Sequence, residues 1–161
     1  MNLGKIEVAD RVGTYVIKLS GDVRLNLCSA LENYLDSMFQ DEEFTSVFID
    51  LSDAQGIDST TLGQLAKISI VSQSKFDLLP TIISPREDIL RILESMGFDQ
   101  VFKIIDKIPA QISGLNELNC VPLNEEQMRK KVIAAHEILI SLNEKNKSTF
   151  QELVDNLQGK D

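Results

Sequence analysis

The chain has 161 residues, 43% of them hydrophobic and 25% charged, which is typical of a globular protein. Its net charge is −9 at pH 7 and it lacks a basic stripe interleaved with aromatics, so we expect no nucleic-acid binding. No apolar stretch approaches the ~20 residues that span a bilayer, so we expect no membrane partner. Cys28 and Cys120 lie far apart without metal or redox spacing, as is typical of reduced thiols in a cytoplasmic protein.

The first part of the chain predicts alternating strands and helices. Strands are expected at Lys5–Ala9 and Tyr15–Ser20, and the apolar spacing of residues 25–39 predicts a helix after them. A nearly continuous apolar run at Val47–Leu51 predicts a strand covered on both faces. The Ser, Asp and Gly residues of Ser52–Ile57 then predict a loop.

The stretch after this loop holds the most informative motif. Four residues in a row are candidate helix caps: Asp58, Ser59, Thr60 and Thr61. They open a helix expected over Leu62–Lys75, in which Gly63 is unfavourable unless close packing on the sheet requires it. The free N–H groups of a helix start favour negative charge, so a hydroxyl there is suited to carry a phosphate. A capping role with no further function is the alternative that the local chemistry leaves open.

The alternation continues to the end of an expected domain over residues 1–108. The stretch Ser84-Pro85-Arg86-Glu87 predicts a helix start with Ser as cap and Pro at the first position. Gly97 is expected to end that helix, and Val101–Ile105 is the last expected strand. The pattern predicts an α/β fold with a mixed sheet of four to five strands.

The remaining residues predict a connector over 109–122 and a helical extension over 123–161. The capping box Asn124–Gln127 opens a long helix whose apolar residues follow a 4-3-4-3 spacing. Ser148–Gln151 predicts a second helix start, so we expect an antiparallel helical hairpin with its turn near residues 143–147. Packing within the chain is favoured over exposure, because an exposed apolar stripe invites association.

The motif Asp58-Ser59-Thr60-Thr61-Leu62-Gly63 is similar to the Asp-Ser-Ser/Thr-Gly-Leu-Gly signature of the STAS family, the bacterial anti-sigma factor antagonists. Gly21-Asp22-Val23 resembles the turn after the family's second strand, and residues 81–98 resemble its last strand–helix segment. The resemblance covers roughly residues 4–106. It departs at Thr61, where the family usually has Gly, and at Arg24, where an acidic residue is common.

The resemblance implies that Ser59 is phosphorylated by a partner kinase, which often doubles as the anti-sigma factor, and is dephosphorylated by a metal-dependent serine/threonine phosphatase. We therefore expect a non-enzymatic switch without metal or cofactor, which binds an anti-sigma factor while Ser59 is unphosphorylated. We expect phosphate to change the interface more than the fold. The residues expected to bind partners are Asp22, Arg24, Asp53, Asp58, Ser59, Thr60 and Thr61.

Two alternatives remain open. In the first, the chain is a constitutive scaffold or assembly subunit, in which Ser59 is only a cap and the helices of residues 123–161 recruit other regulatory proteins. In the second, Asp50 accepts a phosphoryl group as in a receiver domain, but the acidic pair and the late Lys expected of that fold are missing. His136, the one histidine, has no nearby Cys or second His to make a metal site and is expected to be solvated or at the edge of the core.

Overall fold

The computed structural model describes residues 4–24, 28–107, 113–120 and 122–159. The strands are β1 (Lys5–Arg11), β2 (Thr14–Val23), β3 (Ser46–Asp50), β4 (Ala54–Ile57), β5 (Thr81–Ile83), β6 (Lys103–Ile105) and β7 (Asn116–Glu117). The helices are α1 (Cys28–Phe39), α2 (Ser59–Phe76), α3 (Glu87–Ser95), α4 (Glu125–Leu142) and α5 (Glu144–Leu157), with a 3-10 turn, η2, at Phe98–Gln100. The helix start expected at residue 25 lies outside the described residues. Among those residues, no helix is both long enough and apolar enough to cross a membrane.

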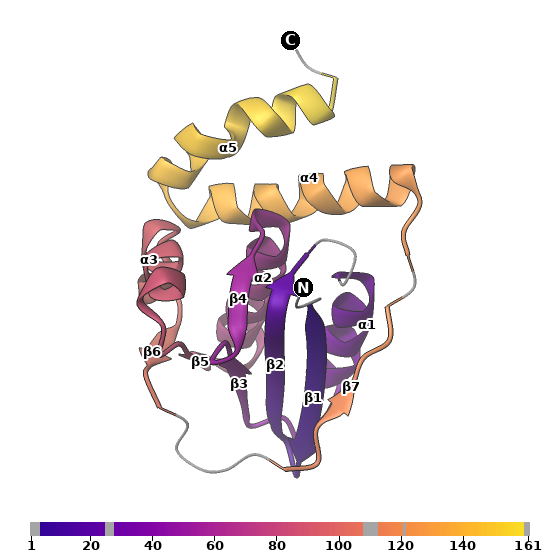
Figure 1. Ribbon diagram of the computed structural model, residues 1–161, viewed down its shortest axis with the longest axis vertical. Coiled ribbons are helices and arrows are strands. Elements are labelled where there is room, and N and C mark those ends of the chain that lie inside the picture. Colours follow the sequence, from indigo (N-terminus) through magenta and orange to yellow (C-terminus); the bar gives the residue numbers. More distant parts are fainter. Residues whose placement is uncertain (1–3, 25–27, 108–112, 121, 160–161) are drawn as a thin grey trace.

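The strands of the described ranges form one mixed sheet (Figure 1). Its order is β6-β5-β3-β2-β1-β7, and β4 pairs separately with the end of β2. The β1–β2 and β1–β7 pairs are antiparallel, whereas β2, β3, β5 and β6 run parallel to one another. The predicted α/β class is confirmed, and the sheet has two strands more than the five expected.

The two additional strands lie where the sequence predicted a loop and a connector. The loop prediction is wrong for Ala54–Ile57, which pairs parallel with β2 beyond a register shift between Gly21 and Asp22. The connector contains β7, which pairs with β1 through Glu7 opposite Glu117. Both strands are short and lack apolar alternation. Each is held in the sheet by pairing with a longer neighbouring strand.

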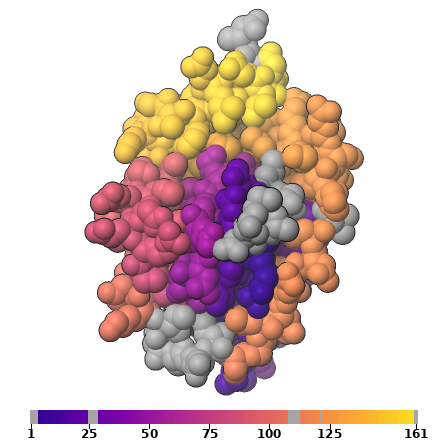
Figure 2. Space-filling view, in the orientation of Figure 1, coloured from indigo at the N-terminus to yellow at the C-terminus, as the bar shows by residue number. Residues whose placement is uncertain are grey.

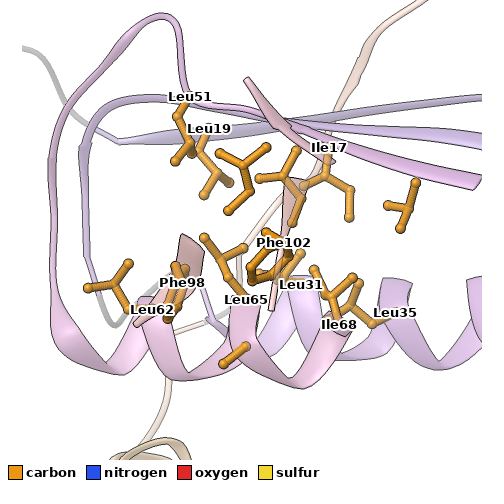
Figure 3. Packing of buried hydrophobic residues seen from close by; sticks show 14 of the residues in the cluster. Ile17, Leu19, Leu31, Leu35, Leu51, Leu62, Leu65, Ile68, Phe98 and Phe102 are labelled. Carbon is orange, nitrogen blue, oxygen red and sulfur yellow. The ribbon is translucent and has the colours of Figure 1, made fainter. Parts of the chain in front are cut away.

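Helices α1 and α2 cover one face of the sheet (Figure 1). Along β2 every second residue is buried, because successive side chains of a strand point to opposite faces. On α2 the buried residues Leu62, Leu65 and Ile68 point toward the sheet, where Figure 3 shows Ile17 and Leu19 facing them. This packing fixes α2 against the sheet, so its first turn lies at the end of β4.

The start of α3 differs from the prediction. The helix begins at Glu87 with Arg86 as N-cap residue and no side-chain cap bond, so the predicted Ser84 cap is wrong. Ser84 is buried and extends β5 instead, its N–H bonding to the end of β6. The Arg86 guanidinium reaches across to the Ala54 carbonyl, 3.4 Å away. Gly97 ends the helix as predicted, with a φ of 82°.

Helices α4 and α5 form a hairpin that covers one end of the molecule (Figure 2). The predicted capping box is confirmed, because the Gln127 N–H donates to the Asn124 side chain at 2.8 Å and the reciprocal bond is 3.0 Å. The start predicted at Ser148 is wrong. Asn143 is extended, which ends α4, and its side chain accepts from the Asn146 N–H at 2.8 Å, which starts α5. The predicted packing of the extension within the chain is confirmed, since α4 lies against α2.

Candidate functional site

The candidate site is built where β4 turns into α2. Asp58 has an extended backbone, and its carboxylate accepts from the Thr61 N–H at 2.8 Å, so Asp58 is the N-cap of α2. The N–H of Asp58 donates to the Val23 carbonyl at the end of β2, at 3.3 Å. Ser59 is therefore the first residue of α2, with its position fixed by the cap on one side and by the sheet on the other.

The Ser59 hydroxyl is hydrogen-bonded to the hairpin. Its Oγ lies 2.7 Å from Nε2 of His136 on α4, and Nδ1 of the same ring lies 2.7 Å from the Val132 carbonyl. A carbonyl only accepts, so Nδ1 carries a proton, and in the tautomer protonated at Nδ1 alone, Nε2 accepts from the Ser59 hydroxyl. His136 is only 2% exposed and packs edge-on against Phe150 of α5, with ring centroids 5.0 Å apart. The predicted solvated or core-edge position of His136 is therefore wrong.

One turn further along α2, the two helix backbones come into close approach. A Cβ on Gly63 would lie 2.3 Å from the Ala135 carbonyl oxygen, far inside van der Waals contact. The prediction that Gly63 packs closely on the sheet is wrong, because the backbone it approaches is that of α4. Ala135 itself is fully buried in this crossing.

Charged side chains flank the start of α2 on the exposed side. The Asp22 carboxylate accepts from Nε of Arg24 at 2.8 Å, and Asp53 pairs with Lys18 at 2.8 Å. The hydrogen bond to Asp53 raises the pKa of Lys18, and the bond to Asp22 raises the pKa of Arg24, to which the charge of Asp58 also contributes. We call Asp22, Arg24 and Asp53 the exposed rim.

The seven residues predicted to bind partners separate into two groups. Those that are exposed or partly buried are Asp22, Arg24, Asp53, Asp58 and Ser59. Thr60 and Thr61 are only 5% and 1% exposed, because α2 turns these positions into the interior. They do not belong to a surface that a partner can contact while α2 is packed, and Thr61 replaces the family's Gly without changing that surface.

The hydroxyl–imidazole pair has the arrangement of an activated serine, but its surroundings favour an interface contact. Ser59 and His136 face each other across the crossing of α2 and α4, and Phe150 covers the ring.

Asp50 is 1% exposed, and its Oδ1 accepts from the Ser52 N–H at 2.9 Å, so it is a buried acceptor and a poor phosphoacceptor. Among the described residues, no three His, Cys, Asp or Glu side chains are grouped to hold a metal ion.

The bond between His136 and Ser59 could not be predicted from the sequence, because a lone histidine does not indicate which helix it will face. A signal for the crossing itself does exist in the sequence. Gly63 and the pair Ala134-Ala135 place small residues on two helices, which is what close approach of two backbones requires.

Two comparisons with known proteins agree with this fold. Residues 5–110 match the profile of the STAS domain, and this match ends before α4. A Thermotoga maritima protein described as "Putative anti-sigma factor antagonist" is 32% identical over 97 residues, which cover 58% of this chain and 83% of that protein. With a family match over more than half of its length, the chain belongs to the STAS domain family.

Proposed function

We propose that this protein is a non-enzymatic, phosphorylation-controlled binding switch of the anti-sigma factor antagonist type, acting in the cytoplasm. In its unphosphorylated state it binds an anti-sigma factor and frees the sigma factor that this partner holds. A serine kinase, which can be the anti-sigma factor itself, phosphorylates Ser59 and ends the binding, and a serine/threonine phosphatase restores it. Membership of the STAS domain family and the description of the Thermotoga maritima relative support this proposal.

The observation that carries the proposal is the position of Ser59 at the N-terminus of α2, next to the exposed rim. A phosphate would add about −1.5 to −2 charges beside Asp58. The helix N-terminus accommodates that charge, so the core fold is expected to survive. A partner surface that fits a neutral hydroxyl does not accommodate it, because like charges and desolvated phosphate oppose binding. A loss of about 3 kcal/mol would weaken affinity roughly a hundredfold.

The charge of the whole chain favours the same kind of partner. A net charge of −9 suits a basic protein surface, which is steered toward the acidic molecule before contact. Within the rim, the Arg24 guanidinium is partly neutralised by Asp22, so the rim does not repel such a partner.

The test is affinity capture from the native cytosol with full-length Ser59→Ala and Ser59→Asp variants, quantified by mass spectrometry. Ser74→Asp is the matched control, because Ser74 is an exposed residue of the same helix. A partner retained by Ser59→Ala and Ser74→Asp but lost from Ser59→Asp supports the switch. Identical partners for all three variants would contradict it and favour a constitutive scaffold.

A second variant locates the docking surface. Arg24→Ala removes an exposed side chain that contacts Asp22 and has no bond to the hairpin among its described contacts. We expect capture of the same partner to fall severalfold while the helices stay folded by circular dichroism. Unchanged capture would exclude the exposed rim from the interface without affecting the dependence on Ser59.

A further inference from the structure

The hairpin of α4 and α5 contacts Ser59, the residue on which the proposed function depends. We propose that docking of this hairpin and phosphorylation of Ser59 exclude each other. The docked hairpin withholds the hydroxyl from a kinase, and a phosphate on Ser59 keeps the hairpin away from α2. This inference deepens the proposed function and depends on it for the phosphorylation of Ser59.

The docked imidazole occupies the space next to the Ser59 hydroxyl. Ser59 Oγ and His136 Nε2 are 2.7 Å apart. One proton fits between two atoms at this distance, but a phosphoryl group does not. The ring cannot turn aside while the hairpin is docked, because its Nδ1 is hydrogen-bonded to the Val132 carbonyl and the ring packs against Phe150. A phosphoryl group and the imidazole therefore compete for the same position.

The backbones of α2 and α4 already lie in close contact at Gly63. A single methyl group on Gly63 would collide with the Ala135 carbonyl. Helix α4 therefore cannot make room for a phosphate by moving closer to α2. Room for a phosphate arises only if α4 moves outward. An outward movement separates the buried side chains Ala135 and Leu139 from α2 and the core.

A clamped arrangement is the opposing possibility, in which the phosphate pairs with a protonated His136. The ring is already at hydrogen-bond distance from Oγ itself, so pairing with phosphate oxygens further out requires the same outward movement. Asp58 adds a negative charge beside the site, which disfavours a docked phosphate. Exclusion is therefore the expected outcome, and clamping is an outcome that the experiment distinguishes.

Part of the core packing is made without the hairpin, although Leu139 and Phe150 of the hairpin belong to the same apolar cluster. The sheet-facing residues Leu62, Leu65 and Ile68 hold α2 from the opposite side (Figure 3). The hairpin is attached to α3 by side-chain bonds to one backbone carbonyl, that of Met96, from Asn143 at 3.3 Å and Asn146 at 2.9 Å. Undocking is thus a local event in which the STAS core stays folded.

Coupling between two events in one molecule is reciprocal. If phosphate weakens hairpin docking by a given factor, docking lowers the equilibrium for phosphate at Ser59 by the same factor. A kinase therefore acts on the open population of the chain, and variants that loosen the hairpin become better substrates.

The experiment uses the full-length chain with phosphoserine incorporated at position 59 during translation, and measures amide hydrogen exchange by mass spectrometry. We expect exchange in α4 and α5 to speed up at least about tenfold, while β2 and the sheet-facing residues of α2 stay protected. Phosphoserine at the exposed Ser74 is the matched control and is expected to leave α4 unchanged. Ser59→Ala removes the hydrogen bond without adding charge, and we expect a smaller acceleration.

Unchanged or slower exchange in α4 would overturn the proposal, and slower exchange would indicate the clamp. Faster exchange throughout the core would also overturn it, since phosphate would then unfold the domain. As a second measurement, a broad-specificity phosphatase is expected to hydrolyse phosphoserine at positions 59 and 74 at similar rates, and resistance at position 59 would contradict an open state. These readouts need no partner, so they stand or fail separately from the capture experiment.

Discussion

Replacing Gly63 by Ala adds one methyl group at the closest approach of α2 and α4. The new Cβ would lie 2.3 Å from the Ala135 carbonyl oxygen, whereas ordinary contacts begin near 3.4 Å. The collision is with backbone, so no rotamer change relieves it. We expect α4 to retreat by about 1 Å together with α5, which packs on it.

The size of the effect follows from two opposing contributions. Helix α2 gains about 1 kcal/mol, because Ala is a better helix former than Gly. A gap of this size removes a quarter to a half of the van der Waals attraction between contacting side chains. For the buried Leu139 the loss is about 1 kcal/mol. The Ser59–His136 bond would be stretched beyond hydrogen-bond range, which removes about 1 kcal/mol more. Docking of the hairpin is thus weakened by about 2 kcal/mol, or roughly 30-fold in its equilibrium.

Trypsin provides the assay, because its target residues Arg129 and Lys130 on α4, and Lys145 and Lys147 on α5, lie within helices that must open before cleavage. We expect cleavage at these sites to accelerate roughly 30-fold in Gly63→Ala, while thermal unfolding of the core is unchanged or shifted upward. Ser74→Ala is the control, since it raises helix propensity in α2 without touching α4. Unchanged cleavage together with higher overall stability would refute the close crossing of the two helices.

Three further predictions concern single contacts. In a double-mutant cycle, Ser59→Ala and His136→Ala are expected to couple by about 1 kcal/mol in urea unfolding, because they share one buried hydrogen bond. The Tyr15 hydroxyl donates to Asp41, which lowers the pKa of that carboxyl. The resulting stability is present above the ordinary carboxyl pKa and is lost as pH falls through the lowered value, so Tyr15→Phe should flatten the loss of stability during acid titration. Asn146→Ala removes two hydrogen bonds, one to the Met96 carbonyl and a buried one to the Leu139 carbonyl, and we expect it to lower the free energy of unfolding by about 2 kcal/mol, measured in urea.

Each of these predictions has a result that contradicts it. Additive effects of the two variants within about 0.3 kcal/mol would show that Ser59 and His136 do not interact in solution. An acid titration of Tyr15→Phe that follows the unaltered protein would assign the lowered pKa of Asp41 to its other donor, the Glu43 N–H. A stable Asn146→Ala variant with unchanged trypsin cleavage would mean that the two bonds made by Asn146 do not hold the hairpin in place.

The parts of the fold with regular apolar spacing could be predicted from the sequence. The Val47–Leu51 run and the 4-3-4-3 spacing of the tail helix each depend on local periodicity, and both elements form as expected. The strands at Ala54–Ile57 and Asn116–Glu117 could not be predicted, because their pairing partners are distant in sequence and their own side chains carry no alternation. Ser84 has every property of a cap, but pairing along β5 and β6 takes its backbone into the sheet.

The candidate site divides in the same way. The cap at Asp58 and the helix start at Ser59 follow from residue types that are adjacent in the chain. The bond to His136 joins residues that are 77 positions apart, and only the crossing of two helices brings them together. Burial of Thr60 and Thr61 depends on the direction in which α2 packs, which the run of hydroxyl residues does not encode.

The pairing of β7 with β1 also determines how the hairpin competes with other molecules. Only residues 118–124 separate β7 from α4, so an undocked α4 starts within roughly 25 Å of the sheet edge. A segment tethered this closely has an effective concentration in the millimolar range. A separate protein at micromolar concentration would therefore have to bind the α2 face roughly a thousandfold more tightly than α4 to replace it. The two-residue strand β7 thus sets a minimum affinity for the α2 face, and a separate protein that binds more weakly does not displace α4.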